Sequence, residues 1–213
     1  MAYVGLRKPI VAPLNSDGTY GDTVAWGKAV AFSEAPNSTS AELYGDDALA
    51  ESEKATTGAG LTLGTTDIPD TVQQPLFGHS ATNSERIANI SDEAGYCGMG
   101  LIGVKKVNGV RAYEARFYPK TQWNDPSVDI NTRAGSTEFQ TPSTEGTAMP
   151  LDNGDWRYVE EFATEAAALA YINGKFGATV TGGSTNNGAT GTGTTGTGAT
   201  GTGSTGTGST GTP

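Results

Sequence analysis

The sequence predicts a mainly β fold with one flanking α-helix and a disordered, Gly/Thr-rich C-terminal tail. Three observations lead to this fold class. An Asn-Gly pair separates two runs of β-favouring residues, and short runs of the same kind alternate with turn residues along most of the chain. A single Ala-rich stretch with helical periodicity follows them, so one helix packed against a sheet is expected.

Two regions of different composition divide the 213 residues. Residues 1–177 contain all three Trp residues and all the charged residues, and their length suits one domain with its own hydrophobic core. Residues 178–213 consist almost entirely of Gly, Thr, Ser, Ala and Asn, the composition of a flexible linker. We therefore expect one folded domain, 1–177, and a low-complexity tail, 178–213.

The clearest local signal is a hairpin over residues 101–113. Asn108 and Gly109 both tolerate the positive φ angles of a type I′ turn. Alternation in the second strand predicts one buried face and one face toward solvent or a neighbour. The alternating residues are Tyr113, Ala115 and Phe117 against Glu114 and Arg116, and Tyr113 and Phe117 are expected in the core.

A second hairpin is predicted over residues 41–53, with Gly45 and Asp46 in its turn. Neither face of its second strand is apolar, because one carries Leu49, Glu51 and Glu53 and the other small residues. This hairpin is therefore expected to face water. Further strands are predicted over residues 57–66, 24–32, 136–141 and 155–162.

The helix is predicted over residues 164–173. Thr164 is a suitable N-cap, the Ala run favours helix, and Gly174 is expected to end it. Leu169, Ile172 and Phe176 form an apolar stripe that would pack against a sheet. A brief helical turn near residues 69–76 is also expected, limited by Pro75.

The charge of the chain excludes several classes of function. Its net charge is −10, and all of this acidity falls within residues 1–177. Nucleic-acid binding and attachment to anionic membranes both need clusters of Lys and Arg, which the sequence lacks. An apolar stretch of signal-peptide or membrane-spanning length is also missing from the sequence. We therefore expect a protein made in the cytoplasm that has no membrane partner.

Catalytic and metal-binding chemistry is not indicated either. His79 is the only histidine, and a surface loop position is expected for it; Cys97 is the only cysteine, and a buried, inert thiol is expected. Neighbouring carboxylates suit a solvated acidic hairpin better than a glycosidase pair or a calcium loop. The sequence predicts a protein that is not an enzyme, with no catalytic residues, metal or cofactor.

Several segments, in their order and spacing, resemble the major tail protein, or tail tube subunit, of siphophages that infect Gram-positive bacteria. The segments are residues 3–9, 43–47 with 51–52, 61–63, 76–79, 96–103, 111–113 with 118–120, 138–142, 145–148, 155–156 and the closing helix. The resemblance covers residues 1–177. It implies a tail-tube-type β-sandwich or barrel with one flanking helix, and a subunit that assembles as hexameric rings stacked into a hollow tube in the virion tail.

The resemblance also implies partners and a role for the acidic hairpin. The partners would be further copies of the chain and the tape measure, tail terminator and distal tail or baseplate proteins. Genomic DNA would pass through the tube without specific binding, past a lumen wall to which residues 41–66 contribute. The expected lumen-facing acidic residues are Asp46, Asp47, Glu51 and Glu53. The tail would be an exterior appendage or a linker to a further domain.

Two other readings remain open at this point. A tail terminator or a head or tail decoration subunit would share the β-rich architecture, but a terminator forms one ring and stops. A carbohydrate-binding module would use Trp26, Trp123 and Trp156, although three tryptophans serve a core or an interface equally well.

Overall fold

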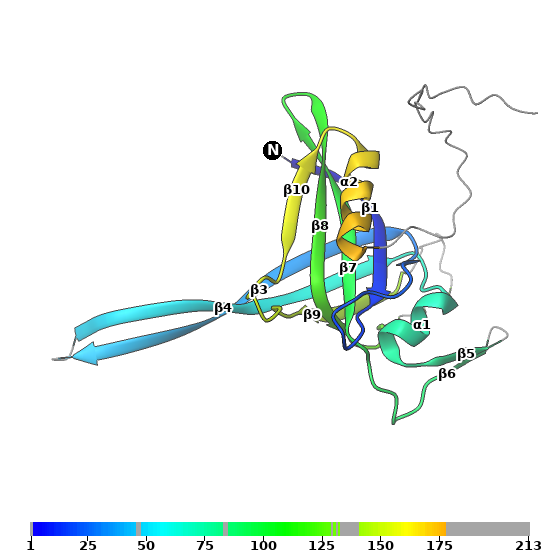
Figure 1. The fold of residues 1–213 in the computed structure, drawn as a ribbon, viewed down its shortest axis with the longest axis horizontal. Helices are drawn as coiled ribbons and strands as arrows, with labels where there is room; N and C mark the ends of the chain where they lie inside the picture. The colour runs from blue at the N-terminus through cyan, green and yellow to red at the C-terminus, as the bar shows by residue number, and fades with distance from the viewer. Residues whose placement is uncertain are drawn as a thin grey trace, which may run out of the picture. The chain divides into compact units, whose positions relative to one another are not determined.

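The computed structural model describes residues 2–45, 48–82, 85–128, 130, 132 and 141–177. These residues form a mainly antiparallel β structure with two helices, which confirms the predicted mainly β class (Figure 1). The tail, 178–213, lies outside the described residues. The elements are β1 (Ala2–Pro13), β2 (Val24–Ala25), β3 (Ala29–Gly45), β4 (Ala48–Thr65), α1 (Asp70–Phe77), β5 (Ser80–Thr82), β6 (Glu85–Ile87), β7 (Cys97–Val107), β8 (Val110–Trp123), β9 (Ser143–Ala148), β10 (Tyr158–Phe162) and α2 (Glu165–Phe176).

One sheet contains all the described strands except β5 and β6. Its strand order is β2-β1-β7-β8-β9-β4-β3, and β10 joins it by pairing with β8. Leu61 and Leu63 of β4 share a core with Met99 and Leu101 of β7, although β8 and β9 lie between these strands in the order. The sheet must therefore curl around this core, and its end strand β3 comes back into contact with β1.

Strand β8 changes its partner where this curl takes place. Its residues 113–117 pair with β10, and its residues 121–123 pair with β9. Pro119 lies between the two paired stretches. Because proline has no backbone N–H to donate to a ladder, it is suited to a position where one partner strand ends and another begins.

In the curled part of the sheet, every second residue of β4 points into the core. In β4, Ala59, Leu61, Leu63 and Thr65 are buried, whereas the residues between them are partly exposed. Trp26 and Trp123 meet edge to face in this core, with ring centroids 4.7 Å apart. These two tryptophans are thus fully buried core residues and are not presented to a ligand.

Helix α2 covers the opposite face of β7 and β8 (Figure 1). Thr164 caps it as predicted, by accepting a hydrogen bond from the backbone N–H of Ala167, and Ile172 and Phe176 are buried. The predicted end was wrong: the helix continues through Gly174 to Phe176 and ends at Gly177. Burial of Phe176 against Tyr20 and Phe117 favours the extra turn.

The contact between α2 and β7 depends on glycine. A Cβ atom on Gly100 would lie 2.3 Å from Cγ2 of Ile172, closer than packed carbon atoms approach. We expect Gly100→Ala to lower the free energy of unfolding by about 1–3 kcal/mol through overpacking. Gly174→Ala is the control, because open space surrounds that position, and there alanine should stabilise the helix by about 0.5–1 kcal/mol. Urea unfolding of both variants measures the difference, and two equal shifts would contradict the packing argument.

A second helix, α1, corrects the expectation of one flanking helix. Pro75 lies inside it, but Val72 and Leu76 are fully buried in the core together with Phe77. Burial of this apolar stripe outweighs the helix-breaking tendency of Pro75, so the predicted brief turn becomes a helix of eight residues.

The hairpin at Asn108-Gly109 is confirmed, with both turn residues at positive φ. The strand predicted over 155–162 corresponds to β10, and Val24–Ala25 with the start of β3 covers 24–32. Residues 136–140 of another predicted strand lie outside the described residues, and β9 begins at Ser143. The hairpin over 41–53 and the strand over 57–66 are parts of one long hairpin, because β4 runs without interruption from Ala48 to Thr65.

Candidate functional site

Within the part of the chain that the structure describes, the outer half of the β3–β4 hairpin is paired only with itself. Strand β9 pairs with residues 59–64 of β4, and β3 has β4 as its sole partner among the described strands. We call residues 37–45 and 48–58 the ribbon; it projects away from the other strands (Figure 1). At about 3.3 Å per residue, nine residues of β3 extend roughly 30 Å beyond the sheet. Both outer edges of the ribbon therefore present unpaired backbone groups.

A bulge marks the point where the ribbon begins. Asn37 pairs with Gly58 but Ser38 pairs with Thr56, so Thr57 is the extra residue. Gly58 has a φ of 142°, and a Cβ atom on it would lie 2.3 Å from the carbonyl oxygen of Ala148 in β9. Only glycine allows β4 to leave β9 in this direction, so this bulge fixes where the ribbon departs.

The two faces of the ribbon differ in charge. Residues directly opposite in an antiparallel pair lie on the same face. Register places Glu53 with Ala41, and Thr39 with Ala55, so these residues and Glu51 share one face, where both glutamates are exposed. Lys54 is opposite Ser40 on the other face, next to Glu42, which is opposite Ser52. Among the described residues, one face therefore carries two carboxylates and no cation, whereas on the other face Lys54 offsets Glu42.

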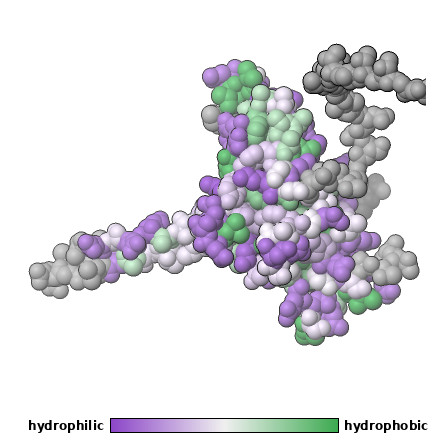
Figure 2. All heavy atoms as spheres, in the orientation of Figure 1, coloured by the Kyte–Doolittle hydropathy of each residue, from purple (hydrophilic) through white to green (hydrophobic). Residues whose placement is uncertain are grey.

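Two of the four predicted acidic residues are thus brought together. Glu51 and Glu53 lie exposed on one face of the ribbon, and the ribbon surface is mostly polar or neutral in Figure 2. Asp46 and Asp47 lie outside the described residues. Whether this face lines a lumen depends on an assembly, so that assignment stays a prediction.

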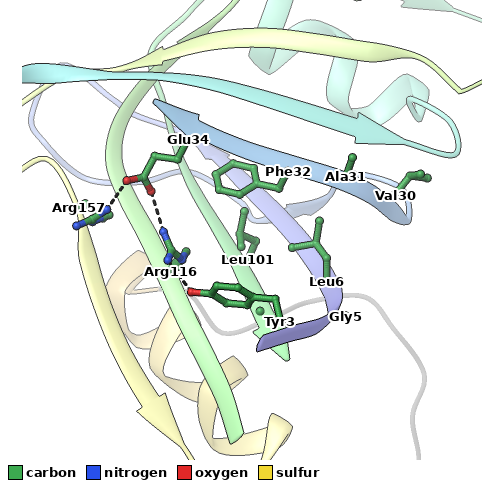
Figure 3. Close-up of a pocket in the computed structure, with 11 residues that line it drawn as sticks. Tyr3, Gly5, Leu6, Val30, Ala31, Phe32, Glu34, Leu101, Arg116 and Arg157 are labelled. Carbon is green, nitrogen blue, oxygen red and sulfur yellow. Dashed lines mark hydrogen bonds and ion pairs between the residues drawn. The ribbon is translucent and has the colours of Figure 1, made fainter. Parts of the chain in front are cut away.

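A cavity of about 580 Å³ lies at the base of the ribbon, where β3 faces β1, β7 and β8 (Figure 3). Phe32, Leu6 and Leu101 form its apolar wall. Glu34 of β3 accepts hydrogen bonds from Arg116, Arg157 and Tyr118, with an Arg116 Nη1 to Glu34 Oε2 distance of 2.8 Å. These contacts attach the root of the ribbon to β8 and to the segment before β10.

A second carboxylate extends this ionic cluster. Glu114 is 3% exposed, and it accepts hydrogen bonds from Tyr3 at 2.7 Å and from Arg116 at 2.6 Å. Lys105 bridges Glu114 and Glu161, which lie directly opposite each other on β8 and β10. The Lys105 Nζ to Glu161 Oε1 distance is 2.5 Å. The lysine therefore offsets the repulsion between two carboxylates that lie directly opposite each other.

Glu114 makes the stability of the protein depend on pH. Burial alone would raise the pKa of Glu114, but hydrogen bonds from Lys105, Tyr3 and Arg116 outweigh burial and hold it below its ordinary value of 4.5. A lowered folded-state pKa contributes stability that is present above the unfolded-state pKa and is lost as pH falls through the folded-state pKa.

We therefore expect urea midpoints to fall as pH decreases below about 4.5, and to fall less steeply in Glu114→Gln than in the wild type. The glutamine cannot be protonated and removes this proton linkage while other carboxylates keep theirs. Equal slopes in the two proteins would show that Glu114 does not contribute to the acid sensitivity.

His79 does not lie in a surface loop, which corrects the prediction. It is 9% exposed, with Nε2 3.2 Å from Asp125 Oδ1 and Nδ1 3.4 Å from Gln73 Oε1. It therefore connects α1 to the chain after β8. The prediction for Cys97 is confirmed: its side chain is buried, and burial raises the pKa of its thiol to about 11, so it is almost wholly uncharged at neutral pH.

Sequence reasoning missed the ionic cluster because alternation cannot distinguish a solvent-facing strand face from one that a distant strand covers. Glu114 and Arg116 were assigned to a face toward solvent or a neighbour, but Glu34, some eighty positions earlier, meets them there. Only the register of β3 against the curled sheet would have shown this.

Within the described ranges, no group of three or more His, Cys, Asp or Glu side chains is arranged to hold a metal ion. No helix in that part of the chain is both long and apolar enough to cross a membrane. No protein-family model matches the sequence, and no curated protein matches it.

Proposed function

We propose that this chain is a structural subunit of a phage tail tube, which assembles as hexameric rings stacked into a hollow tube that conducts DNA. One observation carries the proposal: a long two-stranded ribbon with unpaired edges and one acidic face.

The unpaired edges support assembly. A two-stranded ribbon whose side chains at residues 37–42 and 51–57 are exposed is only marginally stable by itself, because these residues bury little apolar surface and its two edges leave backbone groups without partners. Pairing with the ribbons of neighbouring copies around a closed ring satisfies both edges and leaves none exposed. The ribbon composition, rich in Ser, Thr and Ala, allows close approach of neighbouring strands.

The acidic face supports a conduit. Glu51 and Glu53 point to the same side of the ribbon, so six ribbons in a ring present a continuous negative wall when this side faces inward. Such a wall repels phosphate groups, and DNA slides past it without binding. The curled sheet is consistent with the tail-tube-type sandwich or barrel that the resemblance implies.

Negative-stain electron microscopy of the purified full-length protein, dilute and after concentration, tests this function. Hollow tubes of uniform width are the expected result. Single rings that never stack would favour a tail terminator or related ring protein instead. Compact monomers at every concentration, including after addition of preformed tube fragments as seeds, would contradict the proposal.

A further inference from the structure

A rigid turn displays an isoleucine to solvent. Ile90 has a relative exposure of 105%, and Ile87, just before it, is 54% exposed. Four hydrogen bonds hold the turn. Asn89 and Asp92 exchange two of them: the N–H of Asp92 donates to the Asn89 carbonyl, and the N–H of Asn89 donates to Asp92 Oδ2. In the other two, the N–H and the hydroxyl of Ser91 both donate to Asn89 Oδ1. The apolar side chain is therefore presented in a fixed position.

The turn is also packed against α1. A Cβ atom on Gly78, at the end of α1, would lie 2.7 Å from the carbonyl oxygen of Glu93, and one on Gly95 would lie 3.2 Å from that of Pro75. Residues Glu93 and Gly95, which follow the turn, therefore lie directly against α1 and attach one end of the turn to the fold. A preorganised apolar side chain loses little entropy when it binds, which is the property of an anchor residue at a protein interface.

A complementary cavity lies on a different surface. The cavity has a volume of about 550 Å³. Its lining includes the apolar residues Leu6, Ile10, Ala25 and Leu169 and the cations Arg7, Lys8 and Lys28. Glu165 pairs with Arg7 at 2.5 Å and with Lys8 at 3.5 Å, whereas Lys28 has no ion-pair partner among the described residues. Three cations against one carboxylate give this cavity a net positive charge in a protein of net charge −10.

The charged residues around the turn are opposite in sign to those around the cavity, as a contact between the two needs. Glu85 and Glu93 are exposed on either side of Ile90, and the cation of this segment, Arg86, is already paired with Asp70 at 2.6 Å. The turn is thus an apolar tip with acidic flanks, and the cavity is an apolar hollow with basic flanks.

We propose that the Ile90 turn of one copy inserts into the basic-rimmed cavity of a second copy. The occupant of the cavity is therefore this same chain, and the contact rests on the proposed self-assembly and names one of its interfaces. The turn and the cavity share no residue, so the contact is heterologous. A pair of copies joined by it keeps one free turn and one free cavity, and the contact therefore propagates into a ring or a filament.

Cysteine cross-linking tests the contact directly. The variant carries Ile90→Cys in the turn and Ala25→Cys at the cavity; both positions are exposed, and the native Cys97 is buried. Under a mild oxidant, the concentrated full-length double variant should give a ladder of disulfide-linked dimers, trimers and higher species. Each single variant should give at most dimers. Absence of the ladder in the double variant would overturn the inference.

Assembly measurements separate this inference from the proposed function. Ile90→Ser and Lys28→Glu alter exposed side chains and should leave folding unchanged, but each should raise the concentration needed for assembly by roughly tenfold or more. Glu93→Lys combined with Lys28→Glu should restore part of the loss. Tubes that form equally well in all variants, without a ladder, would overturn the contact and leave the tube function standing. A ladder without tubes would support the contact and count against the tube.

Discussion

Replacement of Lys105 by Met should lower the free energy of unfolding by roughly 3 kcal/mol, the largest stability effect that the structure leads us to expect. The methionine leaves Glu114 and Glu161 facing each other across β8 and β10 without the cation between them. Glu114 is almost fully buried, so its charge keeps only Arg116 and Tyr3 as partners. We place the loss at the low end of the range for broken buried pairs because the Lys105 side chain is 12% exposed. Urea unfolding at neutral pH measures it.

Lys106→Met is the matched control, because the neighbouring lysine is exposed and points to the other face of β7. Its effect should stay within about 0.5 kcal/mol. The double variant Lys105→Met with Glu114→Gln should be more stable than the sum of the single effects predicts, since removing one carboxylate also removes the repulsion. Strict additivity would show that the lysine acts only through its packing.

If the chain forms the proposed tube, Glu53→Lys should convert tubes that exclude DNA into tubes that retain it. The substitution changes the charge of the acidic ribbon face from −2 to zero in each copy, and in the proposed sixfold ring it would place six lysines on the wall where they can pair with phosphates. Retention should be strong at about 50 mM salt and should fall by several orders of magnitude by about 200 mM, because it depends on counterion release. Co-sedimentation of duplex DNA with tubes, followed by nuclease treatment, measures both the amount bound and whether the DNA lies inside.

Ser40→Lys combined with Ser52→Lys adds the same two charges to the opposite face of the ribbon. DNA held by these control tubes, if any, should remain sensitive to nuclease. Nuclease-protected DNA in the control and not in Glu53→Lys would mean that the faces are reversed and that Glu51 and Glu53 lie on the outside of the tube.

Local signals in the sequence were sufficient for the elements whose stability is local. Asn108-Gly109 defined its hairpin, and Thr164 defined the start of α2, because turn and cap preferences act over a few residues. The end of α2 and the full length of α1 depend on what Phe176, Val72 and Leu76 pack against. Burial by distant strands outweighed the local preferences of Gly174 and Pro75.

The same distinction between local and distant interactions applies to the candidate functional site. Alternation in β4 was enough to place Glu51 and Glu53 on one face, and the lack of a wholly apolar face was enough to expect this hairpin in water. The position of Lys54 on the opposite face from them follows from the same alternation. The cluster around Glu34, and the partners of His79, join segments far apart in the chain, and no local pattern reports such contacts.

The long β3–β4 hairpin also has a consequence for the order in which the chain folds. Its two strands follow each other with a short connection, so it closes a small loop and can form within microseconds of being synthesised. The N-terminal strand β1 must instead wait for β7, about ninety residues later, before its long edge is paired. A nascent chain therefore carries a formed hairpin with open edges while the core beneath it is still incomplete, and in this interval two nascent chains are most prone to pair wrongly. Pro36 in β3 limits that risk, since a proline has no backbone N–H and β3 therefore has one hydrogen-bond donor fewer for a wrong partner strand.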